Sequence, residues 1–131
     1  SVRATDPMKA KHLDKALNQF AEEGAAKLFK PMIGAGWIIG VVGALQFEVL
    51  ASRIELEYGI PVRFEQSQFK SARWISGAKD MIEKFMDVNK GHMAMDHDGD
   101  PVYMTRLQWD IDRVERDYPE LTLTATKDIT V

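Results

Sequence analysis

Apolar residues recur along the chain at spacings that predict four amphipathic helices. The most informative stretch runs from Gly40 to Phe64, where one helical stripe lies between two short β-branched runs. This stripe consists of Phe47, Leu50, Ala51, Ile54 and Tyr58. The other three stripes consist of Leu13, Ala16, Leu17, Phe20 and Ala21, of Ala78, Ile82, Phe85 and Met86, and of Leu107, Ile111, Val114 and Tyr118.

Short runs rich in β-branched and aromatic residues predict strands between these helices. The runs are residues 1–4, 26–30, 37–42, 62–66, 69–75, 92–95, 102–105 and 121–126. Asp6-Pro7 is expected to start the first helix, because an Asp accepts from free amides and a Pro suits the first helical position. Ser76 is expected to cap the third helix, and Asp98-Gly99 is a strong turn pair for a hairpin.

The expected order of elements is therefore β-α-β-β-α-β, repeated twice. This order predicts an α+β fold in which each half follows a split βαβ, ferredoxin-like pattern. The halves are residues 1–66 and 67–131, and they share no visible sequence repeat. The pattern leaves open whether one sheet or two sheets form.

The composition is that of a folded protein, with 45% hydrophobic and 28% charged residues among 131. The longest apolar run, 37–45, is broken by glycines and is too short for a membrane helix, and no secretory signal precedes it. The lack of cysteine excludes disulfides and suits a reducing cytoplasm. The chain begins with Ser1 inside an expected strand, as an excised domain of a larger protein would.

The charge balance argues against a domain that grips nucleic acid by itself. The net charge is −3: residues 1–65 carry eight basic and eight acidic side chains, and the remainder carries nine and twelve. Any contact with RNA is therefore expected to use a local patch on a domain tethered to something else.

Two motifs that could bind small ligands do not meet the chemistry required. The glycine-rich segment 34–40 lacks the Lys and the Ser or Thr of a phosphate loop, so a turn between strands is expected there. An acidic cluster with two histidines could hold a metal and comprises His92, Asp96, His97, Asp98 and Asp100. Counted from Asp96, however, the sixth position is Pro101 and the twelfth is Leu107, where a calcium loop needs Gly and Glu. A solvated turn is the favoured interpretation, and no metal or cofactor site is predicted.

Catalysis by this chain alone is not expected. It has no cysteine, and its serines have no histidine at a telling spacing. The adjacent Glu22 and Glu23 point apart on a helix, and His12 is expected on the surface beside an apolar stripe.

Basic residues that alternate with aromatic ones are the best candidates for contact with a large partner. They are Lys27, Lys30, Arg63, Lys70 and Arg73. Strand alternation places Lys70 and Arg73 on opposite faces of one strand, which weakens a simple patch. Lysines at a sheet edge also serve merely to prevent association between sheets.

Several segments, in order and at similar spacing, resemble the C-terminal domain of bacterial peptide chain release factor 3, the class II, GTP-binding release factor. The segments are Glu22-Glu23-Gly24-Ala25, Phe29-Lys30-Pro31, Gly43-Ala44-Leu45-Gln46-Phe47-Glu48-Val49, Arg53-Ile54-Glu55-Leu56-Glu57-Tyr58, Ala72-Arg73-Trp74, Asp98-Gly99-Asp100 with Tyr103, and Glu115-Arg116-Asp117-Tyr118-Pro119. Each segment is a weak signal alone, but the set is specific and covers nearly the whole chain.

This resemblance implies a non-catalytic part of a cytoplasmic translational GTPase that stimulates termination and removes stop-codon-reading release factors from the ribosome. It implies that GTP and GDP bind to an N-terminal domain outside this sequence, so that no nucleotide residue maps here. The first half would correspond to the third domain of elongation-factor-like GTPases. The implied partners are the ribosome, the GTPase and β-barrel domains of the same protein, and functionally the class I release factors, with no membrane.

Two other classes of function share the expected fold. A small-molecule-binding regulatory domain would use the same ferredoxin-like pattern, because a fold alone does not determine function. A small hydrolase of the acylphosphatase type would need an Arg near a helix start with an Asn partner, and no convincing pair is present.

Overall fold

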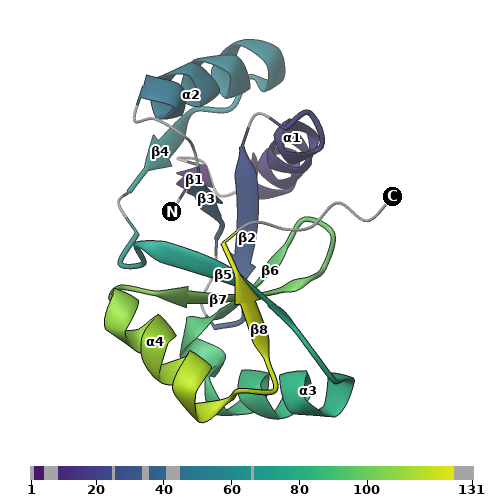
Figure 1. Cartoon of the computed structure of the whole chain (residues 1–131). Helices are drawn as coiled ribbons and strands as arrows, with labels where there is room; N and C mark the ends of the chain where they lie inside the picture. The colour runs from purple at the N-terminus through teal and green to yellow at the C-terminus, as the bar shows by residue number, and fades with distance from the viewer. Residues whose placement is uncertain are drawn as a thin grey trace. The chain divides into compact units, whose positions relative to one another are not determined.

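The computed structural model describes residues 2–4, 9–24, 26–33, 36–40, 45–65 and 67–125 of the chain. Four α-helices and eight strands alternate along these residues (Figure 1). In chain order they are β1 Val2–Ala4, α1 Ala10–Glu22, β2 Lys27–Pro31, β3 Ile38–Gly40, α2 Leu45–Tyr58, β4 Val62–Phe64, β5 Ser71–Ser76, α3 Lys79–Val88, β6 Met93–Asp96, β7 Pro101–Thr105, α4 Gln108–Asp117 and β8 Thr122–Thr124. The predicted α+β class and the predicted order of elements are confirmed.

The chain divides into two compact units. The first contains Ser1–Lys30 and Ala35–Ser67, and the second contains Pro31–Gly34 and Gln68–Val131. Each unit has its own cluster of buried apolar side chains. The helix start expected at Asp6-Pro7 lies outside the described residues. Of the glycine-rich segment 34–40, where a turn was expected, residues 34–35 also lie outside them, and Ile38–Gly40 form β3.

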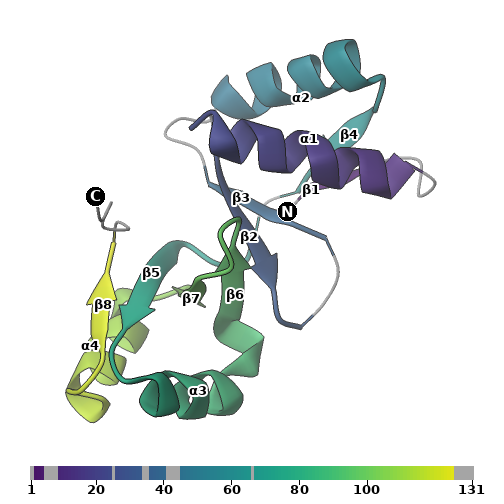
Figure 2. The same cartoon turned by 90° about the vertical axis from the view of Figure 1, so that its right-hand side faces the viewer.

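The core of the first unit is built by the inward stripes of α1 and α2, which lie side by side (Figure 2). All five residues of the predicted α1 stripe are buried, and α2 adds Leu50 and Ile54. Phe47 packs on Phe64 of β4 with 5.3 Å between ring centroids. Strand β1 pairs with β4, and β2 pairs with β3, both antiparallel. The two stripes therefore face a common core, as their helical spacing predicts.

In the second unit, the strands run antiparallel in the order β6-β7-β5-β8. Strand β7 lies between β5 and β6, so the β5-α3-β6 crossover is split by one antiparallel strand. Helices α3 and α4 pack against this sheet through Phe85 and Val114 (Figures 1 and 2). The ring of Phe85 meets those of Tyr103 and Tyr118 edge-on, each at 5.1 Å between centroids.

The ferredoxin-like repeat itself stays a prediction. In the first unit, β1 and β4 form a two-stranded sheet of their own, apart from the β2–β3 pair. Within the described residues, no helix combines the length and the apolar character that crossing a membrane requires.

Two apolar residues assigned to helical stripes are exposed instead. Ala78 and Leu107 each precede the first full turn of their helix, with extended backbone at ψ 138° and ψ 140°. A residue with extended backbone does not continue the helical stripe, and the side chain of Leu107 is 59% exposed.

The predicted Ser76 cap is also wrong. Ser76 is the last residue of β5, where it pairs with Thr122 of β8. The N-cap of α3 is Ala78, which offers no side-chain hydrogen bond. Ser76 therefore belongs to the strand that pairs with β8, at the position where the sequence pattern predicted a helix cap.

Candidate functional site

The carboxylate of Asp96, at the end of β6, accepts three hydrogen bonds. Asp96 is buried, with 8% of the residue exposed. One carboxylate oxygen, Oδ1, accepts from the backbone N–H groups of Asp98 and Asp100, each at 2.9 Å. The other, Oδ2, accepts from the indole Nε1 of Trp74 at 3.0 Å. Asp96 therefore joins the β6–β7 turn to a side chain of β5, which lies on the other side of β7.

The predicted hairpin at Asp98-Gly99 is confirmed. The backbone N–H of Asp96 donates to the Asp100 carbonyl, and the N–H of Gly99 donates to the Asp96 carbonyl, both at 3.0 Å. Gly99 has φ +86°, a left-handed conformation that favours glycine. The register continues with Met95 opposite Pro101.

The turn also uses the central carboxylate of the acidic cluster that was weighed as a metal site. One carboxylate oxygen from each of Asp96, Asp98 and Asp100 lies within 4.8 Å of the other two. Both oxygens of Asp96 already accept N–H donors, which is the behaviour of an Asp that closes a turn.

The two histidines of the same hypothesis have other contacts. The Nδ1 atom of His92 lies 3.1 Å from the Met104 carbonyl, and its ring packs near Phe69. The Nε2 atom of His97 lies 3.4 Å from a carboxylate oxygen of Asp98. The geometry therefore accounts for the cluster as a turn and its supports.

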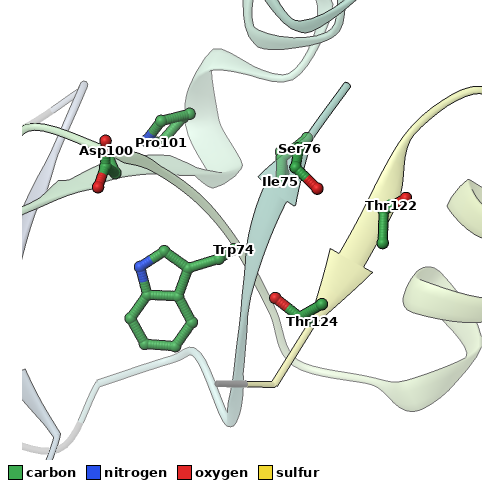
Figure 3. A pocket seen from close by; sticks show the side chains of 7 residues that line it. All are labelled: Trp74, Ile75, Ser76, Asp100, Pro101, Thr122 and Thr124. Atoms are coloured by element: carbon green, nitrogen blue, oxygen red, sulfur yellow. The ribbon is translucent and has the colours of Figure 1, made fainter. Parts of the chain in front are cut away.

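A pocket of about 220 Å³ opens beside the Trp74 indole (Figure 3). It is lined by Trp74, Ile75, Ser76, Asp100, Pro101, Thr122 and Thr124, from β5, β8 and the start of β7. Ligand pockets commonly hold about 300–1,000 Å³. This pocket is smaller, so it gives little support to a small-molecule regulatory domain.

The basic residues predicted to meet a large partner are distributed over both units. In the first unit, Lys27 and Lys30 are exposed on β2, and Arg63 is exposed on β4, which belongs to a different sheet. The Lys30 ammonium lies 5.4 Å from the ring centroid of Trp37, a cation–π distance. The first unit thus places a cation on an aromatic ring at the end of β2.

In the second unit, Lys70 and Arg73 differ in environment. Lys70 is exposed just before β5, and its backbone N–H donates to the Thr105 carbonyl at 2.8 Å. Arg73 is half-buried, and its Nη1 donates to the carbonyl of Ala72 at 2.9 Å. The role of these five basic residues in binding stays a prediction.

Two titratable side chains have shifted pKa values. Burial raises the pKa of the Tyr103 phenol above its ordinary value, and a hydrogen bond with Arg113 offsets part of this rise. Desolvation lowers the pKa of Arg53, but hydrogen bonds to Glu23 and Glu57 outweigh it and leave the pKa raised. Both shifts favour the proton-bound form, which a tyrosine and an arginine already adopt at neutral pH.

Helix α2 carries an outward apolar row that the sequence analysis did not single out. Leu45, Val49 and Leu56 are 76%, 57% and 83% exposed. Their spacing of four and seven residues was visible in the sequence. The inward stripe alone predicts the helix, so the outward row was not needed to recognise it.

Comparison with known families identifies the chain. Residues 1–115 match the family described as class II release factor RF3, C-terminal domain. The match spans both compact units and ends within α4. The chain therefore belongs to the family of class II release factor RF3 C-terminal domains, which are domains of translation-termination factors.

Proposed function

We propose that this chain is the non-catalytic C-terminal domain of a translational GTPase that stimulates termination and removes class I release factors from the ribosome. The observation that carries the proposal is the family match over residues 1–115, which includes both units. In this proposal GTP and GDP bind to a different domain of the factor. The ribosome, the factor's GTPase and β-barrel domains and the class I release factors are its partners, in the cytoplasm.

The mechanical role we assign to the domain is that of an arm that positions the factor and transmits its nucleotide state. Two separate cores support this role, because a packed unit moves as a body and transmits force without unfolding. The largest fully buried side chains include Phe20 and Ile54 in the first unit and Phe85 and Tyr103 in the second. Each unit is thus anchored by its own helix-to-sheet packing.

We assign contact with ribosomal RNA to exposed lysines and arginines, with Lys30 as the first candidate. Its ammonium lies over Trp37, and aromatic rings beside cations are the surfaces on which bases stack next to phosphates. Lys27, Lys70 and Arg63 are exposed and are weaker candidates, while the Arg73 guanidinium donates to the carbonyl of Ala72. Among the described residues, Arg53 and Arg113 also lie over aromatic rings, those of Phe20 and Trp109, but Arg53 is ion-paired with Glu23 and Glu57.

A multiple-turnover peptide-release assay tests the proposal. A class I release factor is kept limiting over terminated ribosomes, and the intact GTPase is compared with the same protein lacking residues 1–131. We expect the intact protein to raise the number of turnovers and the shortened protein to lose this effect while it still binds GTP. Equal turnover with both proteins would contradict the proposal.

A further inference from the structure

Helix α2 has two apolar faces, and only one of them is covered within its unit. At 100° per residue, Val49 and Leu56 fall about 40° and about 20° from Leu45 around the helix axis, whereas Ile54 falls about 180° away. Ile54 is fully buried in the core of the first unit. The exposed row therefore lies directly opposite the core face. A soluble amphipathic helix usually shows polar residues there.

The exposed apolar residues of α2 form a row along the helix rather than scattered single positions. Single exposed apolar residues need no explanation, but Leu45, Val49 and Leu56 follow one line over three turns, with the small Ser52 between them. Contiguous apolar patches on the order of a few hundred Å² mark interaction sites on monomers. We refer to Leu45, Val49, Ser52 and Leu56 as the α2 row.

The two edges of the α2 row differ in charge. Glu48 and Glu55 border one edge, and both are exposed. Among the described residues, neither carboxylate has an ion-pair partner. Glu48 lies in the first turn of α2, where the helix dipole stabilises a negative charge. Glu55 lies outside that turn, so the dipole does not stabilise its charge.

The other edge carries one basic side chain, Arg53, between two acidic ones. Arg53 lies 3.2 Å from Glu23 and 3.4 Å from Glu57, and its guanidinium lies 4.5 Å from the ring centroid of Phe20. One arginine between two glutamates leaves a net negative charge on that edge as well, but both of its carboxylates are ion-paired. Beside the row, the carboxylates without an ion-pair partner among the described residues, Glu48 and Glu55, therefore lie on one edge. A phosphate backbone would be repelled by this edge, whereas a row of Lys or Arg would complement it.

We propose that the α2 row is a docking surface for a basic ribosomal protein, which presents apolar side chains to the row and Lys or Arg to Glu48 and Glu55. This inference rests on the proposed function, because it names one partner within the ribosome. Proteins that bind RNA carry excess Lys and Arg, so a ribosomal protein supplies the charge that this edge lacks. The small size of the row and its charged edge suit a transient contact.

Site-specific photo-crosslinking tests the docking surface. A photoreactive benzoylphenylalanine replaces Val49 in the intact GTPase, and the same substitution at Val88 of α3, which is 73% exposed, serves as the matched control. Each protein is first sedimented with purified ribosomes and then irradiated. The crosslinked peptides are identified by mass spectrometry.

We expect a crosslink from position 49 to a ribosomal protein segment in which apolar residues adjoin Lys or Arg, and no such crosslink from position 88. Glu48→Lys with Glu55→Lys should lower its yield about tenfold, because two attractive pairs become repulsive. Glu83→Lys with Glu115→Lys changes the net charge equally on exposed sites elsewhere and should leave the yield unchanged.

The outcomes separate this inference from the proposed function. Failure of the unmodified GTPase to sediment with ribosomes would overturn the proposed function. Sedimentation with a crosslink to ribosomal RNA, to the GTPase itself or to a second copy would overturn the docking surface alone. Sedimentation without any crosslink, or a crosslink that the double charge reversal leaves unchanged, would overturn it as well.

Discussion

Replacement of Asp96 by Ala should destabilise the second unit far more than replacement of an ordinary surface carboxylate. The change removes the acceptor of three N–H groups, two of them at 2.9 Å and one at 3.0 Å. Hydrogen bonds to a charged group contribute about 1.5–3 kcal/mol each when they are shielded from water. The backbone donors belong to the exposed residues Asp98 and Asp100, so water replaces part of their loss. We therefore expect the free energy of unfolding to fall by about 2–4 kcal/mol.

The assay is urea unfolding followed by tryptophan fluorescence at neutral pH. Asp112→Ala is the matched control, because Asp112 is exposed and accepts one hydrogen bond, from Gln108 at 3.2 Å. Surface changes of this kind usually stay within about 0.5 kcal/mol. Trp74→Phe removes one donor to Asp96 and should cost about 1 kcal/mol. The Trp74→Phe and Asp96→Ala double variant should lose less than the sum of the two single losses, because both remove the same bond.

Two results would refute this reasoning. A loss below about 0.5 kcal/mol for Asp96→Ala would mean that the buried carboxylate does not hold the turn. Stabilisation of the unaltered chain by millimolar calcium, abolished in Asp96→Ala, would show that the carboxylates hold an ion, since a ligand that binds the native state raises its stability.

Three further predictions concern the same unit. Phe85→Ala should lower the free energy of unfolding by about 3–5 kcal/mol because Phe85 is fully buried, whereas exposed Glu83→Ala should stay within about 0.5 kcal/mol, both measured by urea unfolding. Gly99→Ala should cost about 1–2 kcal/mol in thermal unfolding, because φ is +86° there; Gly91→Ala, at a position with open space and no positive φ, should not. Since burial raises the pKa of Tyr103 above 10.0, the unfolded state loses its proton first, so stability should fall as pH rises above 10.0, and Tyr103→Phe should flatten this slope.

The repetitive parts of the fold were predictable from the sequence because they depend on local periodicity. The inward stripes of α1 and α2 were read directly from their spacing, and the Asp98-Gly99 turn from its residue pair. The first residues of α3 and α4 were not predictable, because an apolar residue at helical spacing gives no information about its own backbone angles. The predicted helix starts were therefore wrong where strand pairing or an extended N-cap determined the backbone conformation.

Local sequence patterns could not predict the contacts between elements. Trp74 and Asp96 are 22 positions apart, and only the pairing of β5 with β7 and of β7 with β6 brings their side chains together. The α2 row was visible as spacing, but the sequence alone did not show that nothing within the unit covers it. Of the basic residues chosen as candidates for contact, Lys27, Lys30, Arg63 and Lys70 are exposed and Arg73 is half-buried, and their role in binding stays a prediction.

The central claim is that this domain enables the factor to remove a class I release factor from the ribosome. The most direct measurement is the rate at which a fluorescently labelled class I factor leaves post-release ribosomes after addition of the GTPase, with and without residues 1–131. We expect this rate to fall to the unassisted rate when the domain is missing, while the affinity for GTP is retained. Equal departure rates with both proteins would contradict the claim.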